Sequence, residues 1–219
     1  MPVSFDLFGT LVTVSTASDP AAAVAAELRD RGVAVPDDWA DAYRTPHLDV
    51  PDAAEVPLPA HVAAALRSRG VAASDGVVRR AVVAAFDPEV TRREGVDGAL
   101  AAAREHGPVG LCSNCSVPEL VPRTLVRADL RGAFDAVVTS AACGFRKPHP
   151  TPFETLATDL GGEEGEAPRR AGGTVDPASL VHVGDDPTTD GGIDALGGTF
   201  VDVTETPLSA LGTRLEGLP

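Results

Sequence analysis

The apolar and polar positions follow two different patterns in two parts of the chain. After Gly95, short apolar runs alternate with segments of helical periodicity. Strands that alternate with helices of this length are typical of a parallel, doubly wound sheet. From about residue 15 to residue 90 the pattern shows helical signals and no convincing strand. The sequence therefore predicts an α/β core that is interrupted by a small all-helical insert.

The expected strands are short and rich in β-branched residues. The first is Val3–Phe8, which ends at Gly9-Thr10. Four further strands are expected after the insert, at residues 109–112, 136–139, 180–184 and 199–203. Helices are expected between and around them, at residues 97–106, 117–126, 151–160 and 188–196.

Within the insert, a capping residue, a proline in the first turn and a terminal glycine predict a helix between Ser18 and Gly32. Two more helices are expected near 60–69 and 75–86, after a proline-rich, irregular stretch at 45–59. The predicted domains are therefore residues 1–14 and 91–219 for the core, and residues 15–90 for the insert.

One stretch of the core shows no periodicity at all. Residues 161–176, GGEEGEAPRRAGGTVD, are rich in glycine, glutamate and arginine. A segment of this composition cannot bury enough apolar surface to pack, so we expect a solvated, mobile surface loop.

Composition limits the classes of partner. The 219 residues carry 32 acidic and 18 basic side chains, for a net charge of −14. Such a surface repels phosphate backbones and anionic lipid, so nucleic acid and membrane are poor partners. No apolar run reaches the length of a membrane helix, and the start MPVSFDLFGT does not resemble a signal peptide, so we expect a cytoplasmic protein. Acid excess with a single lysine also resembles proteins of halophilic organisms.

The three cysteines are expected to be reduced thiols. Cys112 and Cys115 form a C-x-x-C pair, but a zinc site would need a second pair of ligands, which the sequence lacks.

Candidate chemistry follows the expected strands, because reactive groups in such sheets sit at the carboxyl ends of the strands. The first strand contains Asp6, and Ser113-Asn114 follows the second. Lys147, the only lysine, follows the third, and the fourth ends before an acidic cluster of Asp185, Asp186 and Asp190.

This set offers a carboxylate nucleophile, a hydroxyl, an ammonium and further carboxylates. Two ionised carboxylates about 4 Å apart repel by about 4 kcal/mol at an effective dielectric constant of 20. A divalent cation between them removes this cost, and Mg²⁺ is suited to carboxylates, waters and substrate oxygens.

The segments SFDLFGTLV, LCSNCS, GFRKPHP and VHVGDDPTTD resemble, in order, the four motifs of the haloacid dehalogenase superfamily. The insert resembles the cap that this family places between its first two motifs, so the resemblance covers essentially the whole chain. It implies a Rossmann-like core and hydrolysis through an aspartyl intermediate.

The resemblance also implies roles for individual residues. Asp6 would be the nucleophile, and Lys147 would orient the transferred group, which Thr10, Ser113 and Asn114 would help to bind. Mg²⁺ would be held by Asp6, the Phe8 carbonyl and Asp185. Asp190 and Asp186 would not contact the ion but would help to hold these ligands in place.

Phe8 departs from the pattern of the family's phosphatases, most of which have a second aspartate two residues after the nucleophile. That aspartate protonates the leaving oxygen, and general acid–base help of this kind contributes about 10²–10⁴ in rate. We therefore expect a Mg²⁺-dependent phosphatase for a small phosphorylated metabolite whose leaving group departs without a proton.

Two alternatives stay open. The family's dehalogenases also have an aromatic residue at the position of Phe8, although they need no metal and lack the Gly-Asp-Asp found at 184–186. A binding or regulatory protein on an impaired enzyme scaffold is the other. The insert shows no motif that indicates the substrate, and nothing indicates the oligomeric state.

Overall fold

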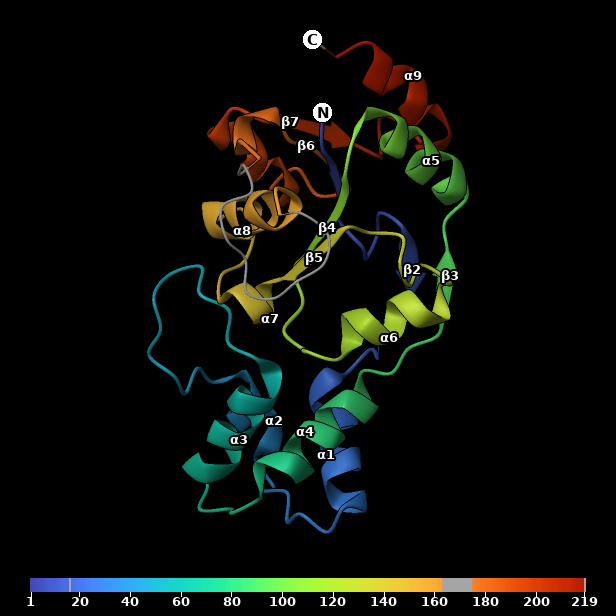
Figure 1. The fold of residues 1–219 in the computed structure, drawn as a ribbon. Helices are drawn as coiled ribbons and strands as arrows, with labels where there is room; N and C mark the ends of the chain where they lie inside the picture. The colour runs from blue at the N-terminus through green and yellow to red at the C-terminus, as the bar shows by residue number, and fades with distance from the viewer. Residues whose placement is uncertain (16, 163–174, 219) are drawn as a thin grey trace.

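The computed structural model describes residues 1–15, 17–162 and 175–218 (Figure 1). Five strands form one parallel sheet in the order β5-β4-β1-β6-β7. They are β1 (Val3–Phe5), β4 (Val109–Ser113), β5 (Ala136–Thr139), β6 (Val181–Gly184) and β7 (Thr199–Asp202). β1 is central, because Val3 pairs with Val109 on one side and with Val181 on the other. The predicted α/β fold with a doubly wound parallel sheet is confirmed.

Helices cover both faces of the sheet. On one face, Val3 and Phe5 belong to the main core, with α5 (Val96–His106) packed on β1 and β4 and α9 (Leu211–Glu216) packed on α5. On the other face, α8 (Pro150–Leu160) packs on β4 and β5 through Phe153 and Leu156. Shorter elements complete the core: α6 (Leu120–Arg127), α7 (Ser140–Cys143), η1 (Pro177–Ser179), η2 (Asp190–Leu196) and η3 (Leu208–Ala210).

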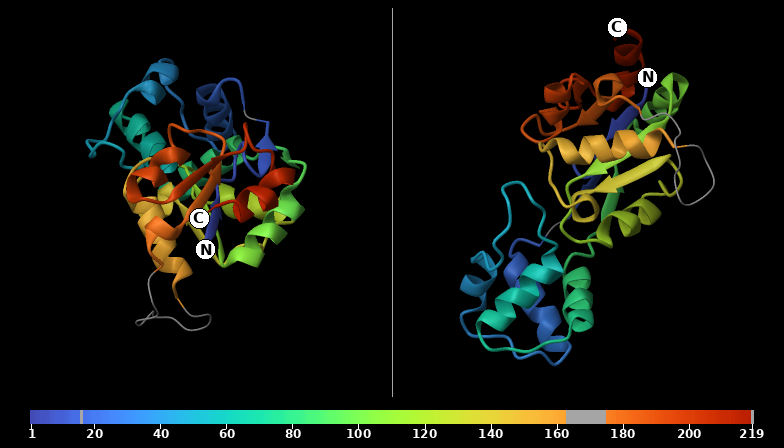
Figure 2. Two further views of the ribbon diagram at one scale, coloured as in Figure 1. Left: turned by 90° about the horizontal axis from the view of Figure 1, so that it is seen from above. Right: turned by 60° about the vertical axis from the view of Figure 1, so that its left-hand side comes forward.

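Four helices form a separate lobe beyond the carboxyl edge of the sheet (Figures 1 and 2). This helical lobe consists of α1 (Pro20–Asp30), α2 (Trp39–Arg44), α3 (Leu58–Ser68) and α4 (Asp75–Ala85). The Asp19 carboxylate caps α1 by accepting from the Ala22 N–H at 3.0 Å, and Pro20 occupies the first turn, as the sequence predicts. No helix in the described ranges is both long and apolar enough to cross a membrane.

A two-stranded antiparallel ribbon joins the lobe to the core. β2 (Val12–Val14) pairs with β3 (Val90–Arg92), with Val12 opposite Arg92. The Ser15 N–H continues this pairing by donating to the Glu89 carbonyl at 3.3 Å. The chain therefore leaves the core and returns to it at the same place.

Several local predictions were wrong. The first strand ends at Phe5 instead of Phe8, and the ribbon strands β2 and β3 were not expected. The segment expected as a helix over 188–196 is a 3-10 helix over Asp190–Leu196. Helix α2 was also not expected. The predicted loop at 161–176 lies, apart from its first two and last two residues, outside the described residues.

Candidate active site

Asp6 lies directly after β1 and is almost fully buried. Its N–H donates to the Val183 carbonyl at 2.9 Å, which continues the pairing with β6. The chain then turns back sharply, and Gly9 adopts a φ of 90° in this turn, a conformation that favours glycine. The carboxylate is thereby fixed at the carboxyl edge of the central strand.

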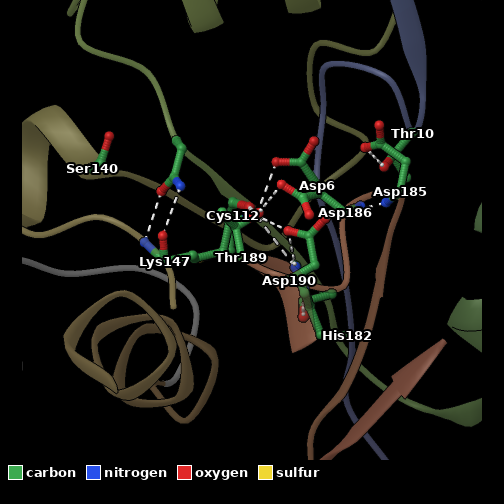
Figure 3. A network of polar contacts seen from close by, with 12 residues as sticks. Asp6, Thr10, Cys112, Ser140, Lys147, His182, Asp185, Asp186, Thr189 and Asp190 are labelled. Carbon is green, nitrogen blue, oxygen red and sulfur yellow. Dashed lines mark hydrogen bonds and ion pairs between the residues drawn. The ribbon is translucent and has the colours of Figure 1, made fainter. Parts of the chain in front are cut away.

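The Lys147 ammonium is enclosed by acceptors from three segments. It donates to Asp6 Oδ1 at 2.9 Å, to Asp190 Oδ1 at 2.6 Å and to the Cys112 carbonyl at 2.6 Å. Figure 3 shows the side chain reaching toward these groups. Burial alone would lower the pKa of Lys147, but the surrounding acidic groups, Asp6 first among them, raise it above its usual value. The ammonium is therefore charged at neutral pH.

The two carboxylates beside Lys147 are shifted in opposite directions. Burial raises the pKa of Asp6 to about 6, and Asp190 adds to this effect while Lys147 opposes it. Burial would also raise the pKa of Asp190, but hydrogen bonding from His182 and the charge of Lys147 hold it below its usual range. At pH 7 both groups are ionised, and Asp6 is the one that can gain a proton in mild acid.

His182, on β6, forms the floor of this cluster. Its Nε2 lies 3.3 Å from Asp190 Oδ1, and its Nδ1 lies 2.8 Å from Ser4 Oγ. Burial, followed by the charge of Lys147, lowers the pKa of His182 to about 4. Because the three protons of Lys147 are used elsewhere, we assign the proton of the neutral ring to Nε2, where it is donated to Asp190.

Ser113 ends β4 beside this cluster, and Asn114 follows it. Ser113 is buried, and its hydroxyl has no hydrogen-bond partner among the described residues. The Asn114 side chain holds the Lys147 backbone on both sides: Nδ2 donates to the Lys147 carbonyl at 3.0 Å, and Oδ1 accepts from the Lys147 N–H at 2.8 Å. Asn114 thus positions Lys147, and the Ser113 hydroxyl remains available for a ligand.

Asp185 extends from the end of β6 toward the Gly9 turn. A Cβ on Gly9 would overlap the Asp185 carboxylate, so only glycine permits this approach. Thr10, which is fully buried, donates from its hydroxyl to Asp185 Oδ1 at 2.9 Å. Asp186, in contrast, is exposed and accepts from the Thr188 N–H at 2.8 Å within its own turn.

Asp190 orders this end of the sheet. Its Oδ2 accepts from the N–H groups of Asp185 and Asp186, at 3.2 and 3.1 Å. Its Oδ1 faces Lys147 and His182, as described above. One buried carboxylate therefore fixes both the loop that carries Asp185 and the ammonium that contacts Asp6.

A model of haloacid dehalogenase-like hydrolases matches residues 3–192. The chain belongs to this family of hydrolases. No sequence among curated proteins gives a significant match.

Solved structures share the fold of this hydrolase. CbbY from Rhodobacter sphaeroides, in complex with phosphate, is 18% identical over 91% of this chain and 84% of that chain, with a TM-score of 0.55. A predicted phosphoglycolate phosphatase from Haemophilus somnus 129pt is 17% identical over 98% and 96%, with a TM-score of 0.54. A structure described as a dehalogenase is 17% identical over 94% and 85%, with a TM-score of 0.50. At these identities the similarity concerns the fold alone.

The donor set at the carboxyl edge suits a divalent cation. The Asp6 and Asp185 carboxylates are close enough for Asp185 to raise the pKa of Asp6. Asp185 lies against the turn that carries the Phe8 carbonyl. In the described part of the chain no group of three or more His, Cys, Asp or Glu side chains is arranged around a metal position. Any metal here would therefore use two carboxylates together with backbone and external oxygens, which is the preference of Mg²⁺.

Sequence reasoning missed the polar support around the hydrolase site. His182 gave no signal, because it is one residue inside an apolar strand. Glu55 was also missed: this buried carboxylate from the segment between α2 and α3 accepts from Ser140 Oγ at 2.5 Å and contacts Arg146 Nη1 at 3.3 Å. Its segment carries no motif, so no local pattern could have indicated the contact.

Proposed function

We propose that this hydrolase is a Mg²⁺-dependent phosphatase that forms an aspartyl-phosphate intermediate on Asp6. The observation that carries the proposal is the buried contact between the Asp6 carboxylate and the lone lysine, Lys147, at the end of the central strand. A carboxylate held by an ammonium in this position is suited to attack an anionic phosphoryl group, because Lys147 offsets the repulsion between the two anions.

In the first step, Asp6 Oδ2 attacks phosphorus while Oδ1 stays on Lys147, and the bond from phosphorus to the leaving oxygen breaks. A pKa of about 6 keeps Asp6 mostly ionised at pH 7. The Ser113 hydroxyl, which has no partner in the described part of the chain, donates to a phosphoryl oxygen. In the second step, water attacks phosphorus and the bond from phosphorus to Asp6 Oδ2 breaks, so that Asp6 is freed as a carboxylate and both protons of the water leave with the product, dihydrogen phosphate.

Mg²⁺, when bound, would neutralise charge on the transferring group and remove the repulsion between Asp6 and Asp185. The carboxylates of Asp6 and Asp185 and the Phe8 carbonyl would hold it. Thr10, by donating to Asp185, would orient that ligand, and Asp190 would orient the same loop through its backbone. We assign Asp186 to stabilising its turn.

The four-helix lobe is proposed to act as a cap, with residues 15–90 as its domain and residues 1–14 and 91–219 as the core. Support comes from its position beyond the carboxyl edge, where Asp6 and Lys147 lie (Figure 1). A cap at this edge would exclude water from the aspartyl intermediate between the two steps.

Phosphate release tests the proposal. We expect turnover of p-nitrophenyl phosphate and acetyl phosphate, with far slower release from an alkyl monophosphate, because Phe8 supplies no proton to the leaving oxygen. EDTA should abolish turnover and excess Mg²⁺ should restore it. Asp6→Asn should remove it. Turnover of all three compounds at equal rates in EDTA would overturn the proposal, and identical activity of wild type and Asp6→Asn would favour a binding role.

A dehalogenase is the second candidate, and Phe8 is the observation that favours it. A departing halide needs no proton, so this reaction would not be impaired by an aromatic side chain in place of a proton donor. Chloride release from 2-chloropropionate in the presence of EDTA would establish this activity, and its absence would exclude 2-haloacids of this type.

A further inference from the structure

A cavity of about 560 Å³ lies where the ribbon and the connections to the helical lobe meet the core. Volumes of this size accommodate small-molecule ligands. The cavity begins next to the candidate site, because its lining includes Phe8, Asn114 and Arg146, the neighbours of the Gly9 turn, of Ser113 and of Lys147. A molecule with its phosphoryl group at Asp6 would therefore extend its remaining part into this space.

The lining is predominantly apolar. Phe8 and Val14 come from the segment between β1 and α1, and Phe86 directly follows α4. Val117 lies just before α6, and Leu120 is its first residue. These apolar side chains offer no hydrogen bond to a ligand. Polar groups elsewhere in the lining come from Ser15, Asn114 and Ser116. A hydroxyl buried against the apolar side chains has no partner, which is unfavourable, so this part of the lining favours an apolar body over a sugar.

The charged residues of the lining do not change this character. Asp87 is paired with Arg127 at 2.6 Å and lies 3.8 Å from Arg123, and the hydrogen bond from Arg127 holds its pKa below the usual range. The second charge is the half-exposed guanidinium of Arg146, whose Nη1 lies 3.3 Å from the Glu55 carboxylate. The cavity is thus apolar in body and does not repel an anionic substrate.

We propose that the substrate is the phosphate derivative of an apolar acid, an acyl phosphate or an aryl phosphate, whose apolar body occupies this cavity. The proposal rests on the proposed function and adds the substrate class to it. The body leaves as a carboxylate or phenolate when Asp6 Oδ2 bonds to phosphorus and the bond from phosphorus to the leaving oxygen breaks. Such an anion needs no proton, which agrees with Phe8 in place of a proton donor.

The test compares benzoyl phosphate with acetyl phosphate. Both release a carboxylate, so the comparison isolates the apolar body. Burying a side chain of phenyl size contributes about 1.5–3 kcal/mol, and we therefore expect kcat/KM for benzoyl phosphate to be at least about tenfold higher. Phenyl phosphate and p-nitrophenyl phosphate, assayed in parallel, determine whether the acyl or the aryl class is preferred.

Substitutions at two positions of α6 locate the effect. Leu120→Ser introduces a hydroxyl into the cavity lining and should lower the ratio of the two kcat/KM values about threefold or more. Val126→Ser changes the same helix at a side chain that is 57% exposed and lies outside the cavity, and should leave the ratio unchanged. Leu120→Ala, which keeps the surface apolar, separates the effect of polarity from that of altered packing.

The outcomes distinguish a failure of the proposed function from a failure of the proposed substrate class. If no compound releases phosphate, or if Asp6→Asn retains full activity, the proposed function fails. If phosphate is released and acetyl phosphate or glucose 6-phosphate is turned over as well as benzoyl phosphate, only the substrate class is overturned. A benzoyl preference that survives Leu120→Ser unchanged would overturn the assignment to this cavity.

Discussion

Two buried serines of the core have opposite surroundings. The Ser113 hydroxyl has no partner within residues 1–15, 17–162 and 175–218, whereas Ser140 Oγ donates to Glu55 at 2.5 Å and accepts from the Cys115 N–H at 2.8 Å. Buried polar groups without a partner lower stability, and the described side chains hold three of them: those of Ser113, Glu119 and Thr124. Only Ser113 lies at the carboxyl edge of the sheet, next to Cys112, whose carbonyl accepts from Lys147, and this position indicates a use in the site. We relate that use to the phosphoryl group that the proposed reaction transfers.

Ser113→Ala should therefore separate activity from stability. We expect kcat/KM to fall by about 10- to 100-fold, since a hydrogen bond to a charged group contributes about 1.5–3 kcal/mol. The free energy of unfolding should change by less than about 0.5 kcal/mol, because no native hydrogen bond is lost. Ser140→Ala is the matched control and should lower the free energy of unfolding by about 1–3 kcal/mol. Equal destabilisation by the two substitutions would contradict this assignment.

His182 gives the protein a defined response to acid. Its folded-state pKa of about 4 lies below the usual 6.5, so between these values the unfolded chain binds a proton that the folded chain does not. Stability from this residue is complete above pH 6.5 and decreases as the pH falls toward 4. Asp6, with its raised pKa, acts in the opposite direction between pH 3.8 and about 6. The two contributions overlap, and a variant is needed to isolate that of His182.

His182→Gln provides that variant, because it keeps an N–H donor for Asp190 and removes the titration. Chemical denaturation at pH 7 and pH 5 should show wild type losing about 2 kcal/mol relative to the variant, from about 1.4 kcal/mol per unit of pKa shift. Parallel stability curves over this range would show that His182 does not titrate as described.

Residues could be predicted where the local pattern isolates them. Asp6 interrupts an apolar run in a recognisable strand, and Lys147 is the only lysine and follows another such strand. The partners of these residues could not be predicted in the same way. Ser4 and His182 are 178 positions apart, and their pairing depends on the register between β1 and β6, which no local pattern specifies.

At the scale of elements, the segment before α3 joins the helical lobe to the candidate site. Ala54 forms an antiparallel bridge with Phe145, and the Glu55 N–H donates to the Gly144 carbonyl at 2.8 Å. The Glu55 carboxylate then reaches Ser140 and Arg146. The lobe is thus attached to the loop that leads directly to Lys147, so loosening the attachment should disturb the ammonium.

Glu55→Ala should lower both stability and kcat/KM. Ser140 would lose its acceptor and Arg146 its carboxylate, and we expect a loss of about 1.5–3 kcal/mol in the free energy of unfolding. Faster proteolysis between α2 and α3 would show that the segment detaches. Glu55→Gln, which keeps an acceptor oxygen, should recover part of the loss. Asp52→Ala, at an exposed position of the same segment, is the control, and an equal effect of both alanine substitutions would refute the coupling.

The predicted elements differ from the observed ones where long-range contacts override local signals. The 3-10 conformation of η2 places Gly192 against Pro148, where a Cβ would overlap the proline, so packing against the Lys147 loop determines its form. The ribbon strands β2 and β3 are three residues each and pair across the whole insert. Segments this short carry too little periodicity to be assigned from sequence.

At the scale of the whole molecule, the lobe and the sheet share one continuous hydrophobic cluster. It includes Phe5 of the sheet, Val12 of the ribbon, and Leu28 and Val82 of the lobe. The insertion could be predicted because the pattern of apolar and polar positions changes along the chain. This continuity could not be predicted, because the cluster is formed by residues that become neighbours only when the ribbon brings both connections together.

The net charge of the whole molecule predicts how its stability responds to salt. A charge of −14 on 219 residues destabilises the compact state through self-repulsion. Exposed ion pairs such as Arg69–Asp38 contribute only about 0–1 kcal/mol each. The stability lost when salt screens these pairs is therefore smaller than the stability gained when salt screens the repulsion. The buried contact between Asp6 and Lys147 is screened much less than either. We therefore expect the midpoint of thermal unfolding to rise with potassium chloride.

The rise should occur mostly below about 1 M, where the Debye length has already fallen from about 10 Å to about 3 Å. A variant that combines Asp30→Asn, Asp49→Asn and Glu94→Gln removes three exposed negative charges. It should unfold at a higher temperature than wild type at 0.1 M salt and at the same temperature at 2 M, because screening makes the removed charges irrelevant. A gap that persists at 2 M would assign the effect to local contacts of these residues, and a midpoint that falls with salt would show that ion pairs outweigh net repulsion in this protein.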